Sequence, residues 1–236
     1  MHISVLCYIY LHQSPIPEEF LDQLGRLLDS QDRFCIEYIK KLSGPVHPAL
    51  SAHRGLAVAE DEDRSGLIVA SSMWPSAEAC QEWFTSKTGV ELVDGMSAFH
   101  DAERLDIVMV DGVFIHEEES EENSALMEAQ RVEITRWRVN LNDKERFQSA
   151  FDALEQQKLK SGKQSNIWSA WQLDSWPARP DSDTIKVFVM IAKCEDDSRE
   201  DGSVEEKACE DVAISVEKKF WTPTSLGFGP SRKSKL

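Results

Sequence analysis

The sequence has little of what marks secreted, membrane-spanning or nucleic-acid-binding proteins. Its five cysteines are an odd, scattered set without a CxxC pair, which favours reduced, buried thiols in an intracellular protein over a disulfide framework. Lys and Arg total 26 against 42 for Asp and Glu, giving a formal charge of −16. Nucleic acids and anionic membrane surfaces would repel this charge. We therefore expect neither as a partner.

Long apolar runs and cofactor motifs are also missing. No run approaches the length of a bilayer span, and the apolar start MHISVLCYIYLHQ lacks the basic flank and cleavage site of a signal peptide. There is no Cys–His cluster and no HxxxH on a predicted helix, so no metal is expected. Residues 227–229 form Gly-Phe-Gly followed by Pro, which is not a phosphate loop, and no G-x-S-x-G elbow occurs. We expect no cofactor.

What is present is enough for a core, because the chain has 236 residues, 41% hydrophobic content and seven Trp. The periodicity of the first half predicts the order β-α-β-β-α-β. Apolar residues recur at helical spacing between Pro17 and Gly44, with a break allowed near Asp29, and a second helix follows Ser76 and is interrupted by glycines. The predicted strands are Ile3–Leu11, Ser51–Ala59, Gly66–Met73 and Glu103–Val110.

The same layout restarts after an acidic run. Residues 116–125 are too acidic and too poor in apolar side chains to form a core, which predicts a linker. Strands are predicted at Arg131–Leu141, Ile167–Leu173 and Thr184–Lys193, and Asn142 is predicted to cap a helix. Apolar residues every fourth position from Val204 to Phe220 predict a last helix, followed by an extended segment instead of a strand. The predicted division is a first unit 1–115, a linker 116–128, a second, degenerate unit 129–222 and a tail 223–236.

One segment carries a family resemblance. In MWPSAEACQEWF, residues 73–84, a strand ends in Trp74 and Ser76 is placed to cap the following helix. This resembles the strand-Trp-x-Ser-x-x-Ala segment of the dimeric α/β-barrel superfamily, which includes antibiotic-biosynthesis-monooxygenase-like and EthD-like proteins. The resemblance implies an α+β fold of two ferredoxin-like β-α-β-β-α-β units, packed sheet to sheet as an intrachain pseudo-dimeric α/β barrel. It also implies a cofactor-free active site, and leaves open further pairing into a homodimer.

The sequence departs from that family in two places. Cofactor-free oxygenases of the family place an amide side chain about four residues before this Trp, where the chain has Ala70. The second half has Ile191–Cys194 where the Trp segment would fall. These departures argue against oxygenase chemistry and favour a pocket in the first half.

Two histidines and two tyrosines are the candidates for catalysis. His53 lies on a predicted strand, and His100 precedes another strand and is followed by Asp101, so either imidazole could act as a general base. Each is more commonly an exposed or backbone-bonded histidine. Tyr8 and Tyr10 alternate onto one face of the first strand, where a phenol could polarise a carbonyl group. Ordinary two-sided strand packing is the commoner explanation for such tyrosines.

Four further residues are candidates for substrate binding. Trp74, Trp83 and Trp168 could wall an aromatic pocket, although most tryptophans belong to cores. Arg136 would bind a carboxylate or phosphate if it faces inward, whereas a solvated position is the usual one for Arg.

The sequence ends in Ser234-Lys235-Leu236, which matches the peroxisomal import signal. It predicts a peroxisomal matrix location and an import receptor as a partner. It contains no information about the reaction.

Together these observations predict a cofactor-independent enzyme for a small apolar, carbonyl-bearing molecule, of the kind found in secondary metabolism. A cyclisation, isomerisation or lyase-type step needs only a dry site and one or two acid–base groups. A cofactor-free monooxygenase is the first alternative. The second is a non-catalytic barrel that binds a ligand or serves in stress responses.

Overall fold

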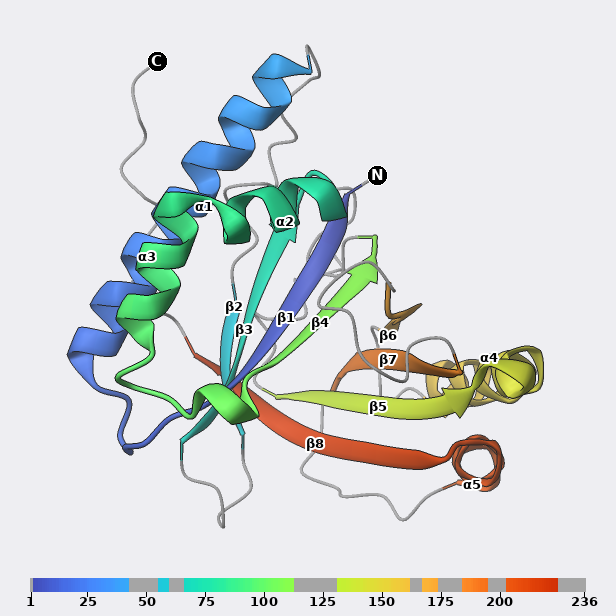
Figure 1. Cartoon of the computed structure of the whole chain (residues 1–236). Coiled ribbons are helices and arrows are strands. Elements are labelled where there is room, and N and C mark those ends of the chain that lie inside the picture. The colour runs from blue at the N-terminus through green and yellow to red at the C-terminus, as the bar shows by residue number, and fades with distance from the viewer. Residues whose placement is uncertain are drawn as a thin grey trace. The chain divides into compact units, whose positions relative to one another are not determined.

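The computed structural model describes residues 2–42, 55–59, 66–112, 131–161, 167–173, 184–194 and 203–224. They divide into two compact units, which we call unit 1, up to Gly112, and unit 2, from Arg131 to Pro223. Each unit has the order strand, helix, two strands, helical segment, strand (Figure 1). The predicted α+β class with two ferredoxin-like units is confirmed.

Unit 1 is an antiparallel sheet with helices on one side. In Figure 1 its three α-helices gather along one side of its strands. The strands lie in the order β4-β1-β3-β2. Its elements are β1 (Ile3–Tyr10), α1 (Glu18–Lys41), β2 (Gly55–Ala59), β3 (Leu67–Trp74), α2 (Ala77–Thr85), α3 (Lys87–Met96), the 3₁₀ turn η3 (Ala102–Arg104) and β4 (Asp106–Asp111).

Unit 2 repeats this topology. Its strands lie in the order β8-β5-β7-β6, so the fourth, first, third and second strands of the unit are neighbours, as in unit 1. The identical order is strong evidence for an internal repeat. Its elements are β5 (Val132–Asn140), η5 (Leu141–Asp143), α4 (Lys144–Ser161), β6 (Ile167–Trp171), β7 (Ile185–Lys193), α5 (Val204–Val212) and β8 (Ser215–Thr224).

The segment from Trp74 to Trp83 folds as predicted. Ser76 caps α2, its Oγ accepting a hydrogen bond from the backbone N–H of Ala79 at 3.2 Å. The Trp74 and Trp83 rings meet at 5.8 Å between their centroids. Because Trp83 lies on α2, this contact shows that the Trp74 side chain points toward the helices. Ile3 is paired with Trp74 across β1 and β3 and therefore lies on the same side, which we call the helix-facing side of the unit 1 sheet. The other side of each sheet is called its far side below.

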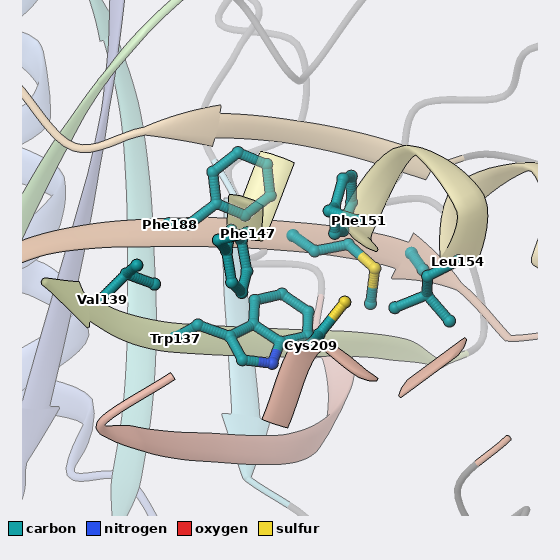
Figure 2. Close-up of a cluster of buried hydrophobic side chains, with 9 residues drawn as sticks. Trp137, Val139, Phe147, Phe151, Leu154, Phe188 and Cys209 are labelled. Atoms are coloured by element: carbon teal, nitrogen blue, oxygen red, sulfur yellow. The ribbon is translucent and has the colours of Figure 1, made fainter. Parts of the chain in front are cut away.

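Unit 2 has an aromatic core on the helix-facing side of its sheet (Figure 2). The Trp137 ring on β5 lies 5.7 Å from that of Phe147 on α4 and 6.2 Å from that of Phe188 on β7, between centroids. Contacts between aromatic rings stabilise a core beyond simple area burial. Unit 2 thus holds its helix to its sheet without a Trp at the end of its third strand.

The predictions about the last helix and the segment after it were wrong. The apolar positions from Val204 to Phe220 do not form one helix: α5 ends at Val212, and Val216 and Phe220 lie in β8. A spacing of four residues repeats on one face of a strand as well as approximately on one face of a helix, so the pattern did not distinguish them. Residues 221–224, predicted as an extended segment, complete that strand. The break that the sequence allowed near Asp29 does not occur, since α1 runs from Glu18 to Lys41 without interruption.

The glycines after α2 do not interrupt a helix but permit a second one. Ser86 ends α2 and caps α3. A side chain at Gly89 would place its Cβ 2.0 Å from the backbone oxygen of Trp83. Glycine at this position therefore lets α3 begin directly against the end of α2. The predicted acidic linker 116–128 lies outside the described residues.

Candidate functional site

The far side of the unit 1 sheet brings together a phenol and a carboxylate. Tyr8 on β1 is paired directly with Asp106 on β4, and on its other flank with Val69 on β3. Directly opposed residues of an antiparallel pair share one face and have Cβ atoms about 5 Å apart. Tyr8 is only 3% exposed. Asp106, which sequence reasoning did not single out, therefore stands beside a buried phenol.

Tyr10 shares this side but has a different environment. The guanidinium carbon of Arg104, in η3, lies 3.8 Å from the centroid of the Tyr10 ring. A cation over the ring face is an attractive contact that occupies that face. One face of the Tyr10 ring is therefore occupied by Arg104.

His100 lies at the end of the same strand but belongs to the helix-facing side. It forms an isolated bridge with Leu11, and strand alternation puts Leu11 on the side opposite to Tyr8 and Tyr10. His100 is 6% exposed, and its Nδ1 is buried with no hydrogen-bond partner among the residues that the structure describes. His53 lies outside the described residues.

Trp74 and Trp83 are part of the unit 1 core. Both are almost fully buried, and their indole N–H groups donate to Ser72 Oγ at 3.0 Å and to Ser30 Oγ at 3.3 Å. Trp74 pairs with Ile3, at the other end of β1 from the bridge that holds His100, a separation of about 26 Å for eight residues of strand. The structure therefore does not bring these tryptophans to His100 or to Tyr8.

Thiol chemistry has no support at Cys7 or Cys80 in unit 1. Burial, with a smaller effect of Asp106, raises the pKa of Cys7 to about 12. Burial also raises the pKa of Cys80. The reactive form of cysteine is the thiolate, so both thiols are unreactive near neutral pH.

In unit 2, Arg136 lies on the far side of the sheet, in an ion-paired cluster that the sequence did not predict. Its guanidinium on β5 pairs with the Glu217 carboxylate on β8, which also accepts a hydrogen bond from the ammonium group of Lys219. Burial alone would raise the pKa of Glu217, but Arg136 and Lys219 lower it overall. Trp168 on β6 shares this side, because it pairs with Ile191 on β7.

The helix-facing side of unit 2 holds a second ionic cluster, also missed from sequence. Glu133, whose side chain is 4% exposed, has carboxylate oxygens 3.7 Å from Lys158 Nζ and 3.6 Å from Lys218 Nζ. Its Oε1 also accepts a hydrogen bond from the Thr135 hydroxyl at 2.9 Å. Lys218 donates in turn to Glu206 Oε1 at 2.7 Å. Two carboxylates and two ammonium groups thus neutralise one another beneath α4 and α5.

This second cluster left a signal in the sequence. Glu133 lies four residues before Trp137 on β5, so the two side chains share the helix-facing side of the strand. On α4, Lys158 continues the row of core residues formed by Phe151 and Leu154. A charged residue at a position that periodicity assigns to the core needs a partner of opposite charge. Pairing such positions across elements would have found the cluster.

Two negative findings apply to the described parts of the chain. No group of three or more His, Cys, Asp or Glu side chains there is arranged to hold a metal ion. No helix there is long and apolar enough to cross a membrane.

The order of strands and helices defines the fold. The chain has the fold of the dimeric α/β-barrel superfamily, with two ferredoxin-like units in one polypeptide. Among solved structures it is similar to an anthrone oxidase-like protein, with a TM-score of 0.58 and 9% identity over 95% of this chain and 92% of that one. It is also similar to a candidate monooxygenase from Fusobacterium nucleatum subsp. nucleatum, with a TM-score of 0.55 and 8% identity over 95% and 93%.

Sequence comparison adds nothing to this likeness. No family model matches the chain, and no curated protein sequence matches it.

Proposed function

We propose that the protein is a cofactor-independent enzyme that removes a proton beside the carbonyl group of a small apolar molecule. Cyclisation, isomerisation and lyase-type reactions can each begin with this step. The observation that carries the proposal is the direct pairing of Tyr8 with Asp106 on one face of unit 1. A phenol and a carboxylate are sufficient for enolate formation when the surroundings are apolar.

Each group has one role in the proposed step. The Asp106 carboxylate takes the proton from the carbon next to the carbonyl, and the electrons of that C–H bond move to form an enolate. The Tyr8 O–H donates a hydrogen bond to the carbonyl oxygen, where the negative charge develops. The neighbouring Val69 and Val108 are buried and apolar, which strengthens such a bond by excluding water. The proton then returns from Asp106 to the isomerised or cyclised product.

His100 is the second candidate for the base. Histidine is a common general base, and the Nδ1 atom of His100 has no hydrogen-bond partner within the described residues. Its assignment to the side opposite Tyr8 favours Asp106. If Asp106→Asn leaves turnover unchanged and His100→Ala abolishes it, His100 is the base.

The proposed step can be measured without knowing the natural substrate. Anthrone is a neutral, apolar ketone whose C10 protons exchange with solvent through its enol. In anaerobic D₂O buffer the protein is expected to accelerate deuterium incorporation at C10, measured by NMR. If the rate equals that of buffer containing an equal concentration of an unrelated protein, enolate formation with this class of ketone is refuted. A role in ligand binding would then be favoured.

A cofactor-free monooxygenase is the alternative, favoured by the likeness of the fold to an anthrone oxidase-like protein. Against it stands Ala70, at the position where the family's oxygenases carry an amide. An oxygen electrode distinguishes the two reactions. The proposed enzyme exchanges the protons of anthrone without consuming oxygen above the background rate, whereas a monooxygenase consumes oxygen in proportion to product.

We further propose that Ser234-Lys235-Leu236 directs the protein to peroxisomes. A fluorescent protein carrying residues 225–236 at its C-terminus is expected to enter peroxisomes. The same fusion without Leu236 is expected to stay in the cytosol. Identical distributions of the two fusions would refute the signal.

A further inference from the structure

The segment between α3 and β4, residues 97–105, has little buried surface. We call it the strap, and in Figure 1 it is the green stretch that leads from α3 into β4. Its residues are exposed or half-buried, with His100 as the one exception. Segments with few buried side chains open locally at a lower free energy than the core of a protein. The strap is therefore a part of unit 1 that can move while the sheet stays folded.

The strap is fastened to the end of β1. His100 forms an isolated bridge with Leu11, which follows β1 directly. Backbone hydrogen bonds of 2.9 Å lie on both sides of this bridge, since the N–H of His12 donates to the strap and the N–H of Asp101 donates to β1. The N–H of Leu11 instead donates to the oxygen of Gly66, before β3, at 2.8 Å. Opening of the strap would therefore release the amides of His12 and Asp101 but not that of Leu11.

The buried side chain of the strap is not fully satisfied. The Nδ1 atom of His100 is buried and has no hydrogen-bond partner among the residues that the structure describes. An unpaired buried polar atom destabilises the arrangement that buries it. When the strap lifts, water reaches this nitrogen atom and supplies a hydrogen bond. The imidazole of His100 thus lowers the free energy that opening requires.

The strap also covers the approach to the Tyr8–Asp106 pair. This pair is the last one of the ladder between β1 and β4 at this end of the sheet, and Tyr10 is the next residue on the same side. Arg104, in the strap, lies over the Tyr10 ring with 3.8 Å between its guanidinium carbon and the ring centroid. Tyr8 is only 3% exposed. A substrate can therefore reach the Tyr8 hydroxyl only after a covering element has moved.

We propose that the strap is a lid over the Tyr8–Asp106 site, and that the unpaired nitrogen atom of His100 keeps this lid ready to open. The lid role rests on the reaction proposed for unit 1, whereas the movement itself does not. In the closed state the strap helps to keep water away from the site, which favours enolate formation. In the open state this end of the sheet is accessible to substrate and product.

Amide exchange tests the movement without a substrate. Exchange of single backbone amides in D₂O is followed by NMR and corrected for intrinsic rates. In the wild type, the amides of His12 and Asp101 are expected to exchange at least about tenfold faster than that of Leu11. His100→Phe removes the unpaired nitrogen atom and is expected to slow these two amides on the order of tenfold, without changing the Leu11 amide. Equal rates at the three positions in the wild type would overturn the lid.

Two further variants guard against a misleading result from His100→Phe. The smaller His100→Leu replaces it if the phenyl ring does not fit, and unchanged exchange of His12 and Asp101 in both variants would overturn the role of His100. Arg104→Gln loses the contact with the Tyr10 ring and is expected to accelerate these two amides by about two- to fivefold. Arg26→Gln, at an exposed position on α1, is the matched control and should not change them.

A reversible lock tests whether opening admits the substrate. Leu11 and His100 face each other as a pair that exchanges no hydrogen bonds, and the Cα atoms of such pairs lie about 4.5 Å apart, which suits a disulfide. In Leu11→Cys/His100→Cys, oxidation with oxidised glutathione is expected to lower deuterium incorporation into anthrone at least about tenfold relative to the reduced form. The wild type treated in the same way should not change.

The lock separates failure of the lid from failure of the reaction. Equal rates for the oxidised and reduced forms would overturn the lid. A reduced form without activity beside an active wild type would make His100 the base and would also overturn it. If the wild type does not accelerate the exchange of anthrone, the reaction proposed for unit 1 fails, and the amide exchange still decides whether the strap opens.

Discussion

Units 1 and 2 have the same strand order but different side chains between helices and sheet. Unit 1 has a tryptophan at the end of its third strand, Trp74, held by Ser72 and by the Trp83 ring. In unit 2 the tryptophan of the helix-facing core is Trp137, on the first strand, and it packs against phenylalanines. Unit 2 also has a buried ionic cluster around Glu133. The second unit is therefore a diverged copy with its own interior. The topology is common to both, and the chemistry of each unit has to be argued from its own residues.

Removal of the tryptophans is expected to have the largest effect. Trp74→Ala and Trp137→Ala should each lower the free energy of unfolding by about 3–5 kcal/mol, because each opens a large cavity in a packed core. If each core belongs to its own unit, hydrogen exchange measured by mass spectrometry should increase mainly in the unit that carries the substitution. Equal loss of protection in both units after either change would contradict this division.

Breaking the ionic cluster should affect unit 2 nearly as strongly. Glu133→Gln removes the charge that Lys158 and Lys218 share, leaving buried ammonium groups without this partner. The expected cost is about 3 kcal/mol, measured by urea denaturation. Glu210→Gln, an exposed acidic residue on the same unit, is the control and should change stability by less than about 0.5 kcal/mol. A cost for Glu133→Gln no larger than the control would mean that the cluster is solvated.

Glu217 should give unit 2 a distinctive acid dependence. Its pKa is lowered in the folded state, since the opposing effects of Arg136 and Lys219 exceed that of burial. Its stabilising contribution is therefore present above the unfolded-state value of about 4.3 and is lost as the pH falls through the folded pKa. The stability difference between wild type and Glu217→Gln, measured from pH 7 to pH 3, should shrink in that range. If this stability difference instead grows as the pH falls, the pKa of Glu217 is not lowered in the folded state.

Removal of the helix caps should have the smallest effect on stability, with a small difference between the two units. Ser76 caps α2, and Ser203 caps α5 by accepting a hydrogen bond from the backbone N–H of Glu206 at 3.1 Å. Ser76→Ala should cost about 1 kcal/mol. Ser203→Ala should cost more, because Glu206 also pairs with Lys218. Equal costs in thermal denaturation would show that the cap does not support the ionic cluster.

Local signals explain what could be predicted from the sequence. The strand, Trp74 and Ser76 are adjacent in the chain, so the hydrophobic pattern and the capping preference defined them without tertiary information. The last strand was missed because Val216 and Phe220 repeat at a spacing that fits both a helix and a strand.

The two polar sites depend on contacts between distant parts of the chain. Tyr8 meets Asp106 only because β4 pairs with β1 in one register, and a shift of one residue would place them on opposite faces. Glu133 and Lys218 are likewise far apart in sequence. The core-facing position of Glu133 could have been predicted, but its pairing with Lys218 required the strand order.

The most direct test of the proposed chemistry compares two phenols of unit 1. Tyr8 lies beside Asp106, whereas Tyr38 lies on α1 and stacks on Phe34 with 5.9 Å between ring centroids. Deuterium incorporation at C10 of anthrone is measured anaerobically for Tyr8→Phe and Tyr38→Phe. Loss of the Tyr8 hydroxyl is expected to lower the catalysed rate by at least about a hundredfold, and loss of the Tyr38 hydroxyl is expected to leave it unchanged. Equal rates for the two variants would contradict the assignment of Tyr8 to the site.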